Sequence, residues 1–180
     1  MTDLIERISA VKRVPAIEAE EFVPRRTGYY SIWVADESSL PRAYADRLRQ
    51  QRMQLIYVGL AAGQTLYERL FQQDLRHKKA SSFFRSLGAA LGFRPLRGSL
   101  VGMKNQRNYK FSSSDTEVIV RWIDSHLQVG VVEESPARHE TERMAIAHFC
   151  PVFNLAHNPR PFSELIAARR ECLEVAYSAL

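Results

Sequence analysis

The chain has 180 residues, a formal net charge of +5 at pH 7 and 46% hydrophobic residues. This length fits one domain with a buried core, and the composition is that of a globular protein rather than a disordered or fibrous one. No apolar run approaches the roughly 18 residues that a membrane helix needs, and the charged N-terminus lacks the apolar stretch of a secretory signal. We therefore expect no membrane partner and a cytoplasmic location, with which the two isolated cysteines, Cys150 and Cys172, agree.

The first strand is expected after a polar N-terminal segment. Residues 1–26 are polar and irregular, with one short helix predicted near residues 3–12. Residues 27–35 (TGYYSIWVA) are rich in aromatic and β-branched side chains, which favours a strand. The two-residue period of a strand places Tyr30 on one face and Tyr29 on the other.

A helix is expected between this strand and the next one. It covers residues 37–53, with Ser39 as its N-cap and Pro41 in its first turn. Residues 54–60 (QLIYVGL) then predict a second strand, and residues 65–79 predict an amphipathic helix.

The middle of the chain is less regular. Glycines and a proline interrupt residues 80–107, so only a short helix near residues 82–91 is expected there. The pattern Ser114-x-x-Glu117 is a capping box and predicts the start of the next helix.

The last third of the chain contains the third predicted strand, at residues 127–132 (LQVGVV). A helix over residues 137–149 is stopped by Pro151, and a final helix follows Ser163. This order of elements predicts an α+β fold with a small three-stranded mixed sheet flanked by helices.

Positive charge is concentrated between Arg69 and Lys110. This segment has ten basic residues and one acid, Asp74, so its net charge is +9 and the other 138 residues sum to −4. Such a segment suits a polyanion, because phosphate contacts release counterions. A solvated basic surface is the alternative that charge alone leaves open.

Four motifs carry the candidate chemistry. In chain order they are Gly28-Tyr29-Tyr30, Tyr57-Val58-Gly59, Leu66-x-x-Arg69-Leu70, and Glu142 followed by Pro151 and Asn154. Singly, strand tyrosines and helical arginines are common in purely structural roles. Glu142 is more informative, because the helical period places it beside the buried stripe of Ile146 and Phe149. A carboxylate there needs a partner, and a metal ion is a suitable one.

Together these motifs resemble the GIY-YIG nuclease superfamily, over roughly residues 27–155. That family has a Gly-Ile-Tyr strand, a Tyr-Ile-Gly strand, a helix with an essential arginine and a later helix with a metal-binding glutamate. Many members, including the nuclease subunit of bacterial excision repair, place proline nine and asparagine twelve residues after that glutamate, as this chain does. The resemblance implies an N-terminal extension (residues 1–26), a nuclease domain (residues 27–155) and a C-terminal helix packed on it (residues 156–180).

The chain departs from the family pattern at several positions. Tyr29 and Val58 stand where the family name has isoleucine, and both keep strand character. The two motif tyrosines are 27 residues apart, so the helix over residues 37–53 looks inserted between the strands.

The arginine motif departs from the family pattern as well. Many members carry histidine four residues after the arginine; here that residue is Gln73, and the nearest histidine is His77, which either assists or is a surface residue. Arg85 is the alternative arginine if Arg69 is not the essential one.

The resemblance implies an endonuclease that hydrolyses phosphodiester bonds in DNA, with RNA left open, using one Mg²⁺ or Mn²⁺ held by Glu142. Arg69 would bind a non-bridging phosphate oxygen, and Tyr30 or Tyr57 would orient or deprotonate the attacking water. Asn154 would bond the surroundings of Glu142 and hold the loop after its helix. Seven basic residues are expected to contact the nucleic-acid backbone: Lys78, Lys79, Arg85, Arg94, Arg97, Lys104 and Arg107.

Other readings remain open. A nucleic-acid-binding module with the same fold would keep the basic segment without the reaction, and an interaction domain is favoured if that segment is dispersed away from Tyr57. A zinc site is not expected, because no histidine has ligand spacing with either cysteine. Restriction, repair, mobile-element processing and an antibacterial toxin all suit a nuclease of this size, and the oligomeric state is not predicted.

Overall fold

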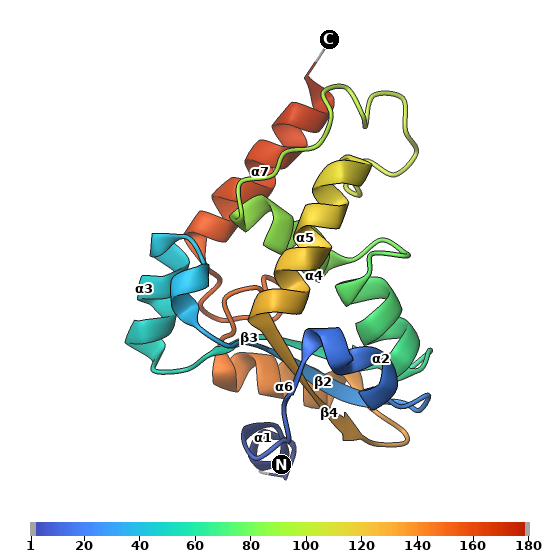
Figure 1. Ribbon diagram of the computed structural model, residues 1–180, viewed down its shortest axis with the longest axis vertical. Coiled ribbons are helices and arrows are strands. Elements are labelled where there is room, and N and C mark those ends of the chain that lie inside the picture. The colour runs from blue at the N-terminus through green and yellow to red at the C-terminus, as the bar shows by residue number, and fades with distance from the viewer. Residues whose placement is uncertain (1–2, 179–180) are drawn as a thin grey trace.

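An antiparallel sheet lies at the centre of the computed structural model, which describes residues 3–178 (Figure 1). Its strands pair in the order β1-β4-β2-β3, and the four are β1 (Val14–Pro15), β2 (Gly28–Val34), β3 (Leu55–Ala61) and β4 (Leu127–Glu133). The α+β class is confirmed. The expected three-stranded mixed sheet is wrong, because β1 adds a fourth strand and each described pair is antiparallel.

The central strand β2 separates two apolar clusters. Tyr30 and Ile32 face a large cluster, whereas Tyr29 and Trp33 face a smaller one, as the two-residue period predicts. In the register of the sheet, Tyr30 pairs with Gly59 of β3 and with Val131 of β4. The opening motif therefore lies in the middle of the sheet.

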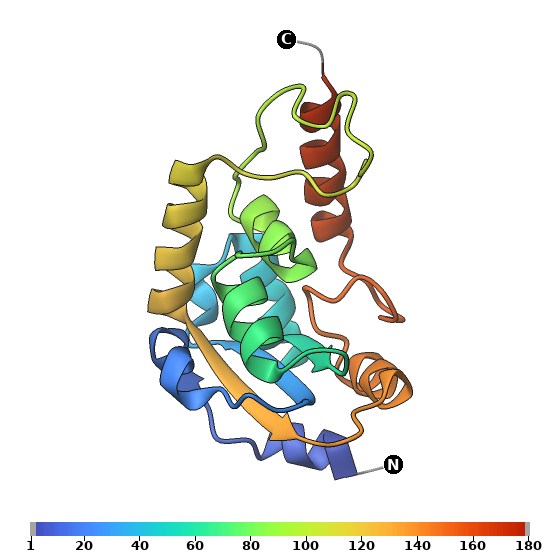
Figure 2. The same ribbon diagram turned by 90° about the vertical axis from the view of Figure 1, so that its right-hand side faces the viewer.

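Helices cover both faces of the sheet (Figures 1 and 2). Those contributing to the large cluster are α3 (Arg42–Gln51), η3 (Tyr67–Leu75), α4 (Ser82–Ala90), α5 (Ser113–His126) and α7 (Ser163–Tyr177). The smaller cluster is closed by α1 (Asp3–Ser9) and α6 (His139–Phe149). Three short elements complete the fold: η1 (Ala16–Glu18), α2 (Ala19–Phe22) and η2 (Glu37–Ser39).

Serine side chains cap the N-terminal ends of two of these helices. The Ser81 hydroxyl accepts a hydrogen bond from the Phe84 amide at the start of α4, and the Ser112 hydroxyl accepts one from the Asp115 amide at the start of α5. The predicted cap at Ser114 is therefore wrong by two residues, because the hydroxyl that accepts from a free amide of the first turn is that of Ser112.

The element predicted as an α-helix over residues 65–79 is a π-helix, η3. Its backbone bonds join residue i to residue i+5, and His77, at φ 51°, follows it in the left-handed region. Wider winding of this kind is rare and recurs at functional sites.

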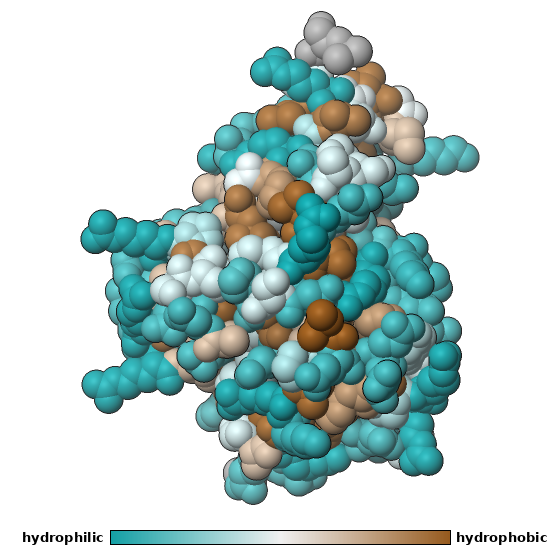
Figure 3. Space-filling model, viewed as in Figure 1, coloured by the Kyte–Doolittle hydropathy of each residue, from teal (hydrophilic) through white to brown (hydrophobic). Residues whose placement is uncertain are grey.

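The segment between α4 and α5 runs beside α7 at the end of the molecule away from the sheet (Figure 2). The Leu100 amide donates to the Ala176 carbonyl at 3.0 Å, and the Tyr177 phenol donates to the Gln106 carbonyl at 2.7 Å. Figure 3 shows hydrophilic residues over most of one face, with hydrophobic patches along its middle and near its upper end. Within residues 3–178, no helix is both long and apolar enough to cross a membrane.

Candidate active site

Tyr30 and Tyr57 project from neighbouring strands on the same face of the sheet, with ring centroids 6.2 Å apart. Gly59 explains the spacing of the second motif. A side chain there would collide with the ring and hydroxyl of Tyr30, which lies directly over this glycine. The Tyr57-x-Gly59 pattern therefore supplies one phenol and makes room for the other.

Asp74 is the centre of the site. It is fully buried and accepts three hydrogen bonds: from the Tyr30 phenol at 2.5 Å, from the Arg69 guanidinium at 2.5 Å and from the Ser81 hydroxyl at 2.6 Å. The network joins β2, η3 and the start of α4. From the sequence, Asp74 has no expected role beyond being the one acid of the basic segment. Its position as a single carboxylate among ten basic residues is the signal that could have identified it.

The π-helix explains why Arg69 and Asp74 meet. In an α-helix, residues five apart project about 140° from one another. In η3 the residue five positions on lies one turn further along the same side, so the guanidinium reaches the carboxylate. An expectation based on α-helical geometry therefore misses this pair.

Both tyrosines are buried phenols. Burial raises the pKa of Tyr30, and the charge of Asp74 raises it further while Arg69 opposes the change. Burial and Asp74 also raise the pKa of Tyr57, Arg69 lowers it, and Glu142 adds a smaller increase. Tyr30 is fully buried and Tyr57 is 7% exposed, so only Tyr57 retains contact with solvent.

Glu142 lies in the first turn of α6. Burial raises the pKa of its carboxyl, and the nearby charges of His139 and Arg69 lower it. The His139 Nδ1 atom is 3.7 Å from the Glu142 carboxylate, whose side chain is 18% exposed. Arg69 and Glu142 therefore influence each other through their charges, and Glu142 influences Tyr57, but among residues 3–178 no hydrogen bond or ion pair joins Glu142 to either of them. Within residues 3–178, no group of three or more histidine, cysteine or acidic side chains is placed to hold a metal ion.

Asn154 attaches the segment after α6 to the outer edge of β3. Its side-chain oxygen accepts from the Val58 amide at 2.9 Å, and its side-chain nitrogen donates to the Val58 carbonyl at 2.9 Å. The Phe153 amide donates to the Ile56 carbonyl at 3.0 Å. The amide thus holds the loop, as expected, but its hydrogen bonds go to the strand that carries Tyr57 rather than to Glu142.

His77 and Arg85 lie beyond Asp74, on the α4 side of the network. The His77 ring stacks on Phe84 with centroids 4.2 Å apart, and burial lowers its pKa, with Arg85 and Lys110 adding to the decrease. Arg85 is 7% exposed, so most of its side chain is enclosed and only a small part reaches the surface. Neither residue bonds directly to Tyr30, Tyr57 or Glu142 in the part of the chain described.

The other basic residues expected to bind nucleic acid are spread along the molecule. Arg94 is paired with Glu171 at 2.5 Å and bonds two backbone carbonyls. Exposed side chains belong to Lys78, Lys79, Arg97, Lys104 and Arg107. Lys104 and Arg107 lie on the segment beside the end of α7, at the end away from the sheet (Figure 2). The exposed basic residues therefore lie in separate places, since Lys78 and Lys79 follow η3 closely along the chain whereas Lys104 and Arg107 lie near the end of α7.

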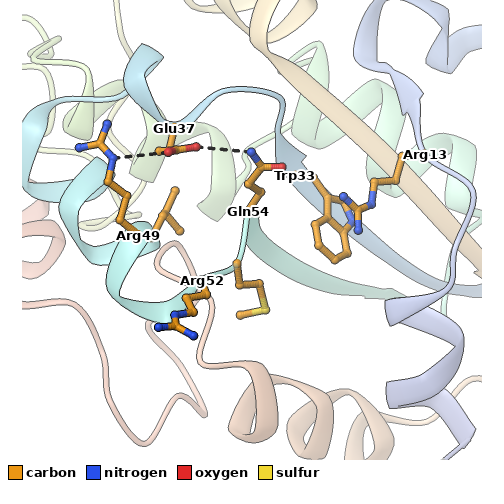
Figure 4. Close-up of a pocket in the computed structure, with 8 residues that line it drawn as sticks. Arg13, Trp33, Glu37, Arg49, Arg52 and Gln54 are labelled. Atoms are coloured by element: carbon orange, nitrogen blue, oxygen red, sulfur yellow. Dashed lines mark hydrogen bonds and ion pairs between the residues drawn. The ribbon is translucent and has the colours of Figure 1, made fainter.

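A separate surface pocket of about 390 Å³ lies beside the C-terminal end of β2 (Figure 4). Arg13 stacks over Trp33 at 3.5 Å there, and Glu37 bonds both Arg49 and Gln54. Trp33 faces the opposite side of the sheet from Tyr30, so this pocket contains no motif residue.

The family of GIY-YIG catalytic domains matches the chain over residues 28–172. This range includes both motif tyrosines, Arg69, Asp74, Glu142 and Asn154. Neither the curated proteins nor the solved structures gave a significant match. The match covers well over half of the chain and agrees with the antiparallel sheet and its flanking helices, so the protein belongs to the GIY-YIG family, whose catalytic domains are those of nucleases.

Proposed function

We propose that this protein is a metal-dependent endonuclease that hydrolyses phosphodiester bonds in DNA. The observation that carries the proposal is the buried Asp74 network, which aligns Arg69 and Tyr30 beside Tyr57 and within electrostatic reach of Glu142. A module that only bound nucleic acid would not need a buried carboxylate to fix one arginine and one phenol together.

Arg69 has the properties of a phosphate ligand. Its side chain is 17% exposed, so the guanidinium is oriented by Asp74 while the side chain retains contact with solvent. Arginine has five N–H donors in a rigid fork, and one of them goes to Asp74. The remaining donors can bind a non-bridging phosphate oxygen, where charge accumulates as the ester breaks.

The two tyrosines have different roles. The Tyr30 phenol donates a hydrogen bond to Asp74, so Tyr30 helps to position the carboxylate that holds Arg69. Tyr57 keeps contact with solvent, and the charge of Glu142 acts on its phenol. Tyr57 is therefore the tyrosine that orients the attacking water and takes its proton. Because burial raises the pKa of Tyr57, this role requires additional positive charge in the site.

Glu142 fits the family's divalent cation. Burial raises the pKa of Glu142 because it disfavours the charged carboxylate, and a bound cation would stabilise that carboxylate. A single carboxylate suits Mg²⁺, which keeps several waters and takes further oxygens from the substrate phosphate; Mn²⁺ accepts the same ligands. When bound, the ion would polarise the phosphate and lower the pKa of nearby acidic groups.

A plasmid nicking assay tests this function. Wild-type protein should nick DNA with Mg²⁺ and lose the activity in EDTA. Glu142→Gln should be inactive, whereas Glu140→Gln, an exposed acid two residues away on α6, should retain activity. Nicking that survives both EDTA and Glu142→Gln would refute the metal role. Tight DNA binding without nicking would instead support the non-catalytic module.

A further inference from the structure

Arg85 on α4 is a buried cation whose hydrogen-bonding groups are not satisfied. Its Nε and Nη1 atoms have no hydrogen-bond partner among residues 3–178, although the side chain is almost fully enclosed. Burial lowers the pKa of Arg85 to about 10, and the charge of Arg169 contributes. Native proteins seldom leave buried donors unpaired, so the position calls for an acceptor.

Further buried nitrogen atoms without a partner lie on two neighbouring residues. Arg169, from the adjacent helix α7, donates to the Ser82 carbonyl at 3.1 Å and to the Ser86 hydroxyl at 2.9 Å, but its Nε atom has no partner in the described chain. The buried Nδ1 atom of His77 is likewise without a partner there. These three residues, Arg85, Arg169 and His77, form what is called here the α4–α7 cluster.

Nearby carboxylates do not complete the cluster. Asp74 acts on Arg85 and His77 through its charge, but its oxygens already accept from Tyr30, Arg69 and Ser81. The Arg85 guanidinium and the His77 imidazole thus share one carboxylate that is also paired elsewhere. The two arginines make the excess positive, and their unpaired guanidinium nitrogens are N–H donors, which is the chemistry that binds a phosphate.

We propose that the α4–α7 cluster is a second phosphate subsite, which holds a backbone phosphate of the strand whose scissile phosphate lies at Arg69. This assignment rests on the proposed nuclease function for the identity of the strand. Asp74 connects the two positions, since it bonds Arg69 directly and acts on Arg85 through its charge. The subsite would fix the direction of the strand across the site without reading its bases.

The test measures DNA binding in a Glu142→Gln background, with EDTA present, so that no cleavage occurs. Arg85→Gln and Arg169→Gln should each weaken the affinity of duplex DNA at least about tenfold. Each should also reduce the slope of log K against log salt by about 1. Arg170→Gln is the matched control, because this neighbour on α7 is exposed and pairs with exposed Glu174; it should change neither quantity.

Two further measurements separate the outcomes. Inorganic phosphate should raise the melting temperature of an Arg69→Gln variant, in which only the α4–α7 cluster is left to bind it, but not that of the Arg69→Gln/Arg85→Gln double variant. This result holds even if nicking fails, so the subsite can survive the loss of the proposed function. If phosphate stabilises the protein but Arg85→Gln and Arg169→Gln bind DNA as tightly as the parent does, the cluster does not hold a phosphate of the DNA strand, and the proposal is overturned. If Arg85→Gln does not fold, as judged by circular dichroism, Arg169→Gln decides alone, and a wild-type salt slope for it overturns the proposal.

Discussion

Asp74→Asn is the most informative single substitution, because it keeps the shape of the side chain and removes its charge. An amide has one acceptor oxygen, so at least one of the three present donors loses its acceptor. Arg69 also loses its charged partner. A hydrogen bond to a charged group contributes about 1.5–3 kcal/mol, and breaking a buried ion pair costs about 3–5 kcal/mol. Because Arg69 is 17% exposed and can gain water, we expect a loss of about 2–4 kcal/mol.

For a chain of this size, that loss lowers Tm by roughly 5–15 °C. Activity should fall further than stability implies, by about 10²-fold in kcat, because a small misplacement of Arg69 removes phosphate alignment. Thermal melts and single-turnover nicking below the Tm of the variant measure the two effects separately. Asp124→Asn is the control: it breaks the Arg76 pair at 2.8 Å on the neighbouring helix α5, and should leave nicking unchanged. Wild-type nicking by a folded Asp74→Asn protein would refute the positioning role.

Three other predictions concern the tyrosines, the motif glycine and Glu142. Tyr57→Phe should lower kcat by about 10²–10⁴-fold with little change in stability. Tyr30→Phe should lower the free energy of unfolding by about 1–3 kcal/mol, because Asp74 loses a buried donor. Nicking rates and urea melts distinguish the two effects. Gly59→Ala should cost about 1–3 kcal/mol, since the new methyl meets the Tyr30 ring, and an unchanged urea midpoint would contradict this. Burial raises the pKa of Glu142, so its ionisation disfavours the folded state as pH rises. Glu142→Gln should therefore raise Tm at pH 7, by an amount that shrinks below the ordinary pKa of a glutamate; a lower Tm at pH 7 would contradict the burial argument.

The sequence predicts the parts of the site that depend on local patterns. The strand around Tyr30 and the strand around Tyr57 follow from side-chain alternation, and Glu142 is recognised by its place beside the apolar stripe of its helix. Gly59 also has a local reason, since the phenol of Tyr30 fills the space above it.

Other parts depend on geometry that residue patterns do not encode. Asp74 reaches Arg69 only because η3 winds as a π-helix, and the amphipathic period of nine residues does not distinguish this from an α-helix. The two-residue strand β1 is too short to show alternation, and it contains Pro15, which favours an edge position. The burial of Arg85 depends on α7, which packs on α4 from the far end of the chain.

The central claim is that Arg69 and Glu142 act on one phosphate with one cation. Single-turnover cleavage of duplex DNA in Mg²⁺ by Arg69→Gln, Glu142→Gln and the double variant tests it most directly. Residues that act as a unit are not additive, so each single change should remove nearly all activity and the double variant should be no slower than the slower single one. Partial losses that multiply in the double variant, or near wild-type cleavage by either single variant, would contradict the account.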